Sequence, residues 1–489
     1  MEEPNGNFIN FTFTDSLLTG LTNAAGQTIN FTYNAQGHLA TVVDAVAAPS
    51  RTYTYSYDSG GNLTEVKDPL NGTCKYSYLV NGPMKDLSDK NNNKVNIIYF
   101  PDLTARELIG CNKRLSFSYD SSSNSTVVTD YLEAGNQVTI YKYKTVGDKS
   151  WVISKSGNCC GFNVSYEYDN QGNATKVTDA NGQVYTYTFD STGNMLTATN
   201  PLGEVSTYTY SNSFNKITSY TDPKGNIYTL SYDIKGNLLQ LIAPGNLTYS
   251  ATYNATGDIL SSTDPKGNVY NYNYDAWGNP SSVTGPNGYN AVLSFDARGN
   301  LLSFTDARGN NSTAEYDILN RLKKITDPIN YSVQFTYDAE GNILTLKNKN
   351  NETSLYHYDA SNRLVQLTGP TGNMVSFSYD GMNNLLSGKN ALNYESRLSY
   401  DKLNRVKSYK NAEGYEISFS YDGNGNITGA NLPNGRVLNY TYDNLNRLVA
   451  VSDGEGTIGS AAYDKIGNIT SYTNGTGAIP PPLTTILTG

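Results

Sequence analysis

The sequence predicts an all-β protein built from antiparallel β-hairpins that repeat every 21 residues. A tyrosine–aspartate unit recurs at intervals of 21 residues, with one interval of 22, between residues 168 and 463. Aromatic and small side chains alternate before the Asp, as in YNYNYD (270–275), and this is the period of a β-strand. Each unit also carries two turn signals. A period this regular is typical of a repeat architecture rather than a domain with unique loops.

The reference aromatic ends the first strand of every unit. We expect its ring to lie inside the sheet and to stack on its counterpart one unit away. The Asp that follows starts a turn. The positions are Tyr168, Phe189, Tyr210, Tyr232, Tyr253, Tyr274, Phe295, Tyr316, Tyr337, Tyr358, Tyr379, Tyr400, Tyr421, Tyr442 and Tyr463. The pairs that represent this structural role are Tyr232–Asp233, Tyr274–Asp275, Tyr337–Asp338 and Tyr421–Asp422.

One unit reads as strand, turn, strand, turn. The turn after the reference aromatic, here named the YD turn, has the pattern Asp-x-x-Gly-Asn. Its Asp can accept a bond from the backbone two residues on, and its Gly supplies a positive φ. A second alternating run follows, such as NILTLKN. The other turn, named the second turn, is often Asp-Pro-x-Gly, as at Asp222 and Asp264, where Pro presets φ.

A single hairpin is only marginally stable, so neighbouring units must pair edge to edge. Fifteen regular units then give about thirty strands in a continuous antiparallel ribbon. A twisted open sheet of that width does not stay flat. We therefore expect the ribbon to coil, or to close into a hollow or partial shell.

The units SYDIKGNLLQLIAPGN, TYDAEGNILTL and SYDGNGNITGANLPNG closely resemble the YD repeat of the Rhs family. That family includes bacterial polymorphic toxins, insecticidal toxin complexes, wall-associated proteins and teneurins. The resemblance implies a β-ribbon that spirals into a hollow shell. In the toxin members the shell encloses a variable C-terminal effector, and in teneurins it serves cell-surface contact.

Three regions are expected along the chain: irregular YD-like repeats and a cap over 1–165, the regular array over 166–470, and a linker-like tail over 471–489. Within the first region, residues 148–163 are expected to form a loop or plug. After Asp464 the chain shows neither the self-cleaving core motif nor the toxin domain of the toxin members. These features predict shell repeats alone, as a fragment of a larger Rhs-like secreted protein.

The composition limits the partners. The net charge of −9 and the pI of about 4.9 argue against nucleic acid, whose binding requires Lys and Arg. No apolar run of 18 residues is present, so no membrane span is expected. The start, MEEPNGNFIN, is not a signal peptide. A secreted or cell-surface location therefore requires an export signal elsewhere.

The sequence offers little for catalysis, metals or cofactors. The only histidines are His38 and His357, and no CxxC spacing occurs among the four cysteines. Because the YD aspartates recur once per unit at turns, a structural role explains them all. We predict no enzyme activity, no metal and no cofactor. The cysteines, whose disulfide state is left open, are Cys74, Cys111, Cys159 and Cys160.

In the later units the Gly-Asn of the YD turn alternates with Asn-Arg, so an arginine recurs every 42 residues. Asn tolerates the left-handed region, so the turn can survive the change. Duplication of a repeat pair with solvated arginines is one interpretation. The other is an arginine column, about 19 Å between neighbours, that pairs with turn aspartates or docks an acidic partner. The arginines are Arg321, Arg363, Arg405 and Arg447, and the aspartates are Asp317, Asp359, Asp401 and Asp443.

Two function classes stay open. The first is a non-catalytic shell or scaffold that encapsulates or presents a toxin-type cargo encoded downstream. The alternative is a cell-surface adhesion or carbohydrate-binding repeat protein that uses tyrosine rows as sugar platforms. Short aromatic hairpin repeats of the choline- and glucan-binding kind also run to about 20 residues, but they depend on Trp, and this chain has only Trp151 and Trp277.

Overall fold

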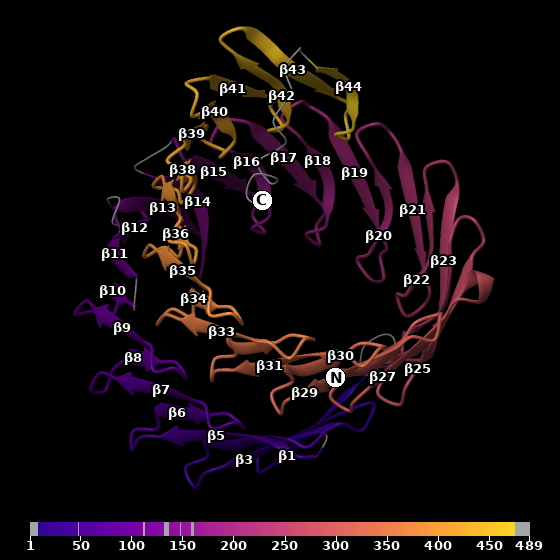
Figure 1. Ribbon diagram of the computed structural model, residues 1–489. Coiled ribbons are helices and arrows are strands. Elements are labelled where there is room, and N and C mark those ends of the chain that lie inside the picture. Colours follow the sequence, from indigo (N-terminus) through magenta and orange to yellow (C-terminus); the bar gives the residue numbers. More distant parts are fainter. Residues whose placement is uncertain are drawn as a thin grey trace. The chain divides into compact units, whose positions relative to one another are not determined.

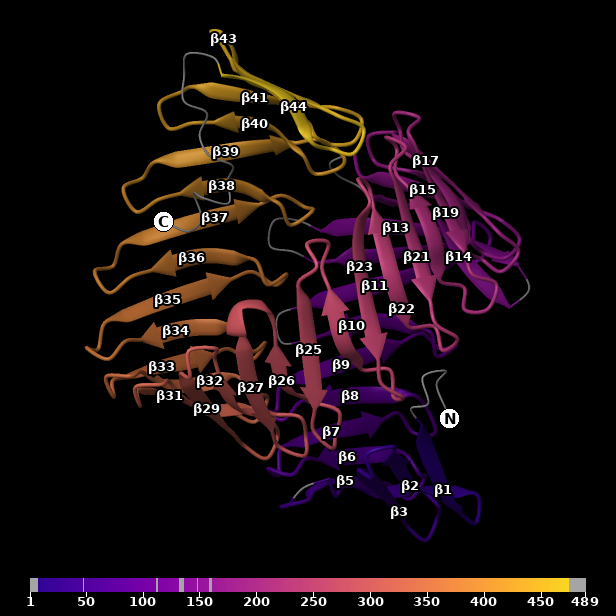
Figure 2. The same ribbon diagram turned by 90° about the vertical axis from the view of Figure 1, so that its right-hand side faces the viewer.

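The computed structural model describes residues 8–46, 48–110, 113–131, 136–146, 148–157 and 161–474. In these ranges it contains 44 β-strands in one sheet and a single short 3-10 turn, η1 (Pro286–Gly288). Strands that follow one another along the chain lie side by side, as in the antiparallel pairs β31–β32 and β32–β33 (Figures 1 and 2). The all-β prediction is confirmed. The predicted thirty strands of the regular array correspond to β15 through β44.

The chain divides into two compact units, each made of two stretches of sequence. Unit 1 comprises Met1–Cys111 and Thr229–Ser376, and unit 2 comprises Asn112–Tyr228 and Phe377–Gly489. Two strands span the sequence boundaries between them, β21 (Ile227–Tyr232) and β35 (Met374–Tyr379).

The first stretch of unit 1 carries β1 (Ile9–Thr14), β2 (Leu17–Asn23), β3 (Thr28–Tyr33), β4 (Leu39–Asp44), β5 (Arg51–Tyr57), β6 (Leu63–Lys67), β7 (Thr73–Tyr78), β8 (Met84–Ser88), β9 (Lys94–Tyr99) and β10 (Ala105–Ile109). Its second stretch carries β22 (Leu238–Ala243), β23 (Leu247–Tyr253), β24 (Ile259–Thr263), β25 (Val269–Tyr274), β26 (Pro280–Thr284), β27 (Asn290–Phe295), β28 (Leu301–Thr305), β29 (Asn311–Tyr316), β30 (Leu322–Thr326), β31 (Ser332–Tyr337), β32 (Ile343–Lys347), β33 (Thr353–Tyr358) and β34 (Leu364–Thr368).

The first stretch of unit 2 carries β11 (Arg114–Asp120), β12 (Ser125–Asp130), β13 (Gln137–Val146), β14 (Lys149–Gly157), β15 (Asn163–Tyr168), β16 (Ala174–Thr178), β17 (Val184–Phe189), β18 (Met195–Thr199), β19 (Val205–Tyr210) and β20 (Ile217–Thr221). Its second stretch carries β36 (Leu385–Lys389), β37 (Glu395–Tyr400), β38 (Val406–Lys410), β39 (Glu416–Tyr421), β40 (Ile427–Asn431), β41 (Val437–Tyr442), β42 (Leu448–Asp453), β43 (Gly456–Tyr463) and β44 (Ile469–Asn474).

Most hairpins turn through five residues whose bonds follow from the predicted pattern. In the YD turn after β31, the amide of Asp338 donates to the carbonyl of Asn342 at 2.9 Å, and Gly341 donates back to Asp338 at 3.3 Å. Gly341 has φ of 98°, which an L side chain rarely adopts. The register shifts between Thr336 and Tyr337. This is a turn closed by a bulge, and it fixes the hairpin register.

Where the reference aromatic is a tyrosine, its hydroxyl can bind the hairpin before it. Tyr337 is half-buried, and its hydroxyl donates to the carbonyl of Leu322, fifteen residues earlier, at 2.5 Å. The guanidinium of Arg321 lies over its ring, 4.8 Å from the centroid. The predicted stacking on another tyrosine is therefore wrong for Tyr337, because an arginine of the preceding hairpin takes that place. The same fifteen-residue bond is made by Tyr33, Tyr99, Tyr210, Tyr253, Tyr274, Tyr400, Tyr421 and Tyr463.

The opposite face of the ribbon carries hydroxyl pairs. The residue before the reference aromatic alternates to the other face, and its hydroxyl meets the hydroxyl nine residues later. Thr336 and Thr345 lie 2.7 Å apart, and Ser294 and Ser303 lie 2.6 Å apart. These pairs are solvent-exposed, so this face of the hairpins is a wet, polar surface.

No thick hydrophobic core is present in the described residues. Five hydrophobic side chains are buried there: Ala291, Ala430, Leu438, Val451 and Ile458. Four of them, in unit 2, form one cluster flanked by partly buried side chains such as Phe419 and Tyr440. The hairpins are thus held mainly by strand pairing, half-buried tyrosines and turns.

Two regions differ from expectation or lie outside the described residues. The expectation of a loop or plug over 148–163 is wrong, because β14 fills Lys149–Gly157 and pairs with β13 over eight residue pairs. The long alternating runs on both sides favour a hairpin there. In the predicted tail, Ser471–Asn474 belongs to β44, and 475–489 lies outside the described ranges. The cysteines Cys111, Cys159 and Cys160 also lie outside these ranges.

Replacement of Tyr337 by Ala should lower the free energy of unfolding by about 3 kcal/mol, because it leaves a cavity and removes the bond to Leu322. Replacement by Phe keeps the ring and should cost only about 1 kcal/mol. Urea unfolding at neutral pH measures both variants. An Ala variant as stable as the parent would contradict the buried role.

Candidate functional site: the turn edges

The YD turn aspartate satisfies the backbone of its own turn and binds neighbours as well. In unit 1, Oδ1 of Asp338 accepts from the amides of Gly341 and Asn342 at 2.9 and 2.8 Å, and Oδ2 accepts from the Asn342 side chain at 2.8 Å. Its backbone carbonyl accepts from Arg321 at 2.8 Å. The reference pairs lie at the ends of strands β21, β25, β31 and β39, as the sequence pattern places them. They build one edge of the ribbon.

The arginine column is part of this edge. Nε of Arg321 donates to Oδ2 of Asp317 at 2.7 Å, within the same turn. Its Nη1 reaches forward to the carbonyl of Asp338, and its plane covers the ring of Tyr337. Arg321 therefore links one hairpin to the next through an ion pair, a hydrogen bond and a cation–π contact.

In unit 2, Arg405 and Arg447 make the same three contacts in their own hairpins. Their carbonyl partners are Asp422 at 2.8 Å and Asp464 at 2.9 Å. Their rings are Tyr421 at 4.5 Å and Tyr463 at 4.8 Å. All four arginine side chains, including Arg363, are 13–20% exposed and pair with the aspartate four residues upstream. A docking role for this column stays a prediction, since the contacts described here are within the chain.

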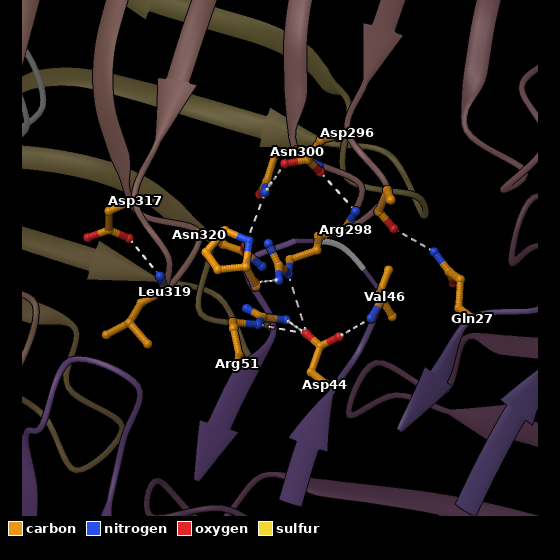
Figure 3. A network of polar contacts seen from close by, with 12 residues as sticks. Gln27, Asp44, Val46, Arg51, Asp296, Arg298, Asn300, Asp317, Leu319 and Asn320 are labelled. Atoms are coloured by element: carbon orange, nitrogen blue, oxygen red, sulfur yellow. Dashed lines mark hydrogen bonds and ion pairs between the residues drawn. The ribbon is translucent and has the colours of Figure 1, made fainter. Parts of the chain in front are cut away.

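The alternation of Gly-Asn and Asn-Arg turns has a structural reason. The side-chain Nδ2 of Asn300 donates to Oδ1 of Asn320 in the next YD turn at 3.0 Å (Figure 3). Asn342 donates to Asn362 in the same way at 3.0 Å. A Gly-Asn turn thus donates forward through Asn, and an Asn-Arg turn donates forward through Arg. The Asn donor meets the Asn side chain of the Asn-Arg turn that follows, so a Gly-Asn turn is matched to an Asn-Arg turn after it.

Within unit 1, turns of residues 1–111 contact YD turns of residues 229–376. Gln27 donates to the carbonyl of Ala297 at 2.6 Å, and Arg298 donates to the carbonyl of Pro49 at 2.6 Å (Figure 3). Asp44, which is 9% exposed, accepts from Nε of Arg51 at 2.7 Å and lies 3.5 Å from Nε of Arg298. This network of charges holds together residues about 250 positions apart.

A second joint in unit 1 uses the turn that starts at Asp89. Nδ2 of Asn91 lies 3.1 Å from both Oδ2 of Asp338 and Oδ1 of Asn362. The amide of Lys90 donates to the carboxylate of Glu340. Asp338 is therefore shared between its own turn and a turn 247 residues earlier.

Unit 2 contains a reciprocal joint of the same kind. Asn181 donates to Oδ2 of Asp422 at 3.0 Å, and Asn424 donates to Oδ2 of Asp179 at 2.8 Å. A Cβ on Gly423 would lie 2.8 Å from the carbonyl oxygen of Ala180. The turns approach so closely that only glycine fits at 423. Lys224 and Asp464 add an ion pair between the same two stretches.

The electrostatics of the turns keep the aspartates ionised. Burial raises the pKa of Asp338, but bonds from Asn342 and Asn91 outweigh it, so its pKa lies below the usual range. Burial also raises the pKa of Asp359 and Asp443. Hydrogen bonds from Arg363 and Arg447 outweigh this effect, so both pKa values are lowered. At Asp422 burial raises the pKa, but hydrogen bonds from Asn426 and Asn181 outweigh it, so the pKa of Asp422 is also lowered.

No group of three or more His, Cys, Asp and Glu able to hold a metal occurs in the described ranges. His38 lies against the ring of Tyr57, 4.8 Å between centroids, at the turn position that Arg321 holds in a later hairpin. His357 lies in β33. Cys74 is a free, half-buried thiol whose pKa is raised by burial. In the part of the chain covered here, no helix is long and apolar enough to cross a membrane.

The sequence identified the turn aspartates and their arginines, but missed the joints between distant turns. Asn91, Asn181 and Gln27 lie in ordinary turn patterns of the irregular or early repeats. Their partners are more than 240 residues away. The one signal in the sequence is Gly423, an extra glycine in the turn DGNGN.

Comparison with known proteins agrees with this geometry. The profile of the teneurin YD-shell family matches residues 101–302 and 303–386, more than half of the chain, and the RHS repeat profile matches 400–437 and 421–458. A search of curated proteins gives no significant match.

Two solved structures share the fold. The crystal structure of TcdB2-TccC3-TEV superposes with a TM-score of 0.75 at 12% identity, over 96% of this chain and 33% of that chain. The crystal structure of TcdB2-TccC3 gives a TM-score of 0.63 at 13% identity, over 96% and 32%. This chain thus spans about a third of the length of those proteins.

Replacement of Arg405 by Ala should lower the free energy of unfolding by about 2 kcal/mol, because it removes a charged hydrogen bond and a cation–π contact and leaves Asp401 unpaired. Arg397 is the matched control, since its side chain is 69% exposed and pairs only at the surface with Glu395. Its Ala variant should change stability by less than about 0.5 kcal/mol. Equal losses in chemical denaturation would contradict the linking role of Arg405.

Stability should fall in acid. The pKa values of Asp338, Asp359, Asp422 and Asp443 are lower in the folded state than the value of about 3.9 in an unfolded chain. Their contribution is therefore complete above that value and is lost as the pH falls through the folded values. Urea midpoints should agree at pH 7 and pH 5 and drop below about pH 4. A midpoint unchanged to pH 2.5 would refute the prediction.

Replacement of Gly423 by Val should separate the two turns of unit 2, since its Cβ would overlap the carbonyl of Ala180. Amide hydrogen exchange should then speed up at Asn181 and Asn424, while the strands stay protected. Replacement of Gly454 by Ala is the control, because nothing lies within 4 Å of that position. Unchanged exchange in the Val variant would show that the turns do not depend on this contact.

Proposed function

The chain belongs to the teneurin YD-shell family, whose profile matches more than half of it, and on that premise we propose that it is a non-catalytic wall segment of a Rhs-type shell. Such a wall would enclose or present a polypeptide cargo of the toxin type, as part of a larger protein that is secreted or held at the cell surface.

One observation carries the proposal. In each unit, turns of ribbon stretches separated by 240 or more residues bind one another. A sheet normally covers its faces with a second layer, but these hairpins have little core and one polar face. Edges that seal on one another are what a single-layer wall requires.

The test uses the protein as isolated from its source cells, with whatever polypeptide it carries. Electron microscopy should show a body with an enclosed volume. Proteinase treatment should leave any enclosed polypeptide intact while it stays in the wall, and should digest it after urea unfolding. An open ribbon, or a cargo cleaved as fast in the native protein as after unfolding, would refute the proposal.

A second candidate, adhesion to carbohydrate, is favoured by exposed tyrosines at second turns. Tyr331, Tyr394 and Tyr415 are 50%, 59% and 60% exposed. Each closes a turn through its backbone carbonyl. The exposed rings of Tyr394 and Tyr415 can stack on a sugar, whereas the ammonium of Lys349 lies over the ring of Tyr331, 6.0 Å from its centroid. A glycan array with the Tyr394→Ala and Tyr415→Ala variants tests this candidate. Specific binding lost in both variants would favour it over a wall without surface ligands.

A further inference from the structure

Unit 1 contains a cavity of about 490 Å³ whose lining differs from the rest of the repeat array. One side is formed by Phe8 and Ile9 at the start of β1 and by the turn that follows β2, at Asn23, Ala24 and Ala25. The other side is formed by two successive YD turns, with Asp258 in the first and Tyr274 and Trp277 around the second. Aromatic rings and a carboxylate thus line the same space.

Both YD turns at this cavity depart from their repeat. Among the YD turns of 166–470, only the turn 254–258 ends in a carboxylate, since Asn254 and Asp258 exchange the usual Asp and Asn. The turn after it carries Trp277, the only tryptophan of the regular array, with its side chain 42% exposed. An exposed indole is the strongest cation–π surface among side chains.

The turn itself holds Asp258 in place. Oδ2 of Asp258 accepts from Nδ2 of Asn254 at 2.8 Å and from the hydroxyl of Thr256 at 2.6 Å. No lysine or arginine of the described residues pairs with this carboxylate. The nearby ammonium of Lys235 donates instead to the carbonyl of Ala255 at 2.8 Å. Asp258 is therefore a preorganised carboxylate without an ion-pair partner among the described residues.

Other hairpins show which group fits beside such a carboxylate. Around Tyr337, Tyr421 and Tyr463, an arginine guanidinium lies over the tyrosine ring and pairs with a turn aspartate. At Tyr274 the ring remains, but the residue at the arginine's sequence position is the carboxylate of Asp258. Burial raises the pKa of Tyr274, and the charge of Asp258 adds to this rise. The local field thus favours a cation.

We propose that this cavity binds a guanidinium group, an arginine side chain presented by a partner polypeptide, between Trp277, Tyr274 and the carboxylate of Asp258. The guanidinium takes the role that the chain's own arginines fill in later repeats. This inference does not depend on the shell proposal, because it concerns a surface cavity of unit 1 alone.

The test is a titration of the full chain with Nα-acetylarginine amide, followed by tryptophan fluorescence. A Trp151→Phe variant leaves Trp277 as the only reporter. At constant ionic strength the fluorescence should change saturably, with a Kd on the order of 1–10 mM for a single cation–π and ion-pair contact. Nα-acetylcitrulline amide, equal in shape but uncharged, should give no saturable change.

Two variants in the Trp151→Phe background complete the test. Asp258→Asn restores the residue common at this turn position, so the fold should persist, and the Kd should rise at least about tenfold. Glu315→Gln removes one exposed carboxylate from the same unit, and its Kd should stay within about twofold. No saturable change with the arginine probe, an equal response to citrulline, or an unchanged Kd in Asp258→Asn would each overturn the proposal.

Discussion

The structure depends on the way a turn aspartate satisfies the amides of its own turn. A five-residue hairpin turn leaves inward-pointing N–H groups, and an unpaired buried N–H is costly. In the YD turns that begin with Asp, one carboxylate oxygen accepts two of them, as Asp338 does from Gly341 and Asn342. The second oxygen and the backbone carbonyl then remain available. Arg321 and Asn91 both use these acceptors of Asp338, the first through the carbonyl and the second through Oδ2.

These turn contacts, repeated along the chain, explain how a protein with few buried hydrophobic residues among those described remains folded. In most repeats a half-buried tyrosine contributes ring packing and one hydrogen bond to the preceding hairpin, as Tyr421 does with Val406 at 2.6 Å. Arginine adds a planar donor that spans two turns and covers the ring. Each contact is small, but it recurs in register. Stability is then nearly a sum of nearest-neighbour terms, as in other repeat proteins.

The last residue of the YD turn differs between repeats. Where the turn ends in Asn or Arg, the acceptors and donors of neighbouring hairpins are matched. Where it ends in Asp258, beside an exposed indole, the match is left incomplete. A regular scaffold makes such a departure visible, because the surrounding repeats show what the position otherwise contains. Function in a repeat protein is therefore sought where one residue breaks the pattern without breaking the turn.

The sequence alone determined the strands, the turns and the pairing of neighbours, because alternation, Gly positions and Asp-x-x-Gly-Asn act within one or two hairpins. It also identified Asp317 and its equivalents as partners of the arginine column, since both lie in one turn. Tertiary structure alone decided that Asn181 meets Asp422 and that Gly423 must be glycine. It also decided that arginine, not tyrosine, covers Tyr337. Those contacts depend on the twist accumulated over many strands or on the rotamer of a long side chain, and neither is encoded in a local pattern.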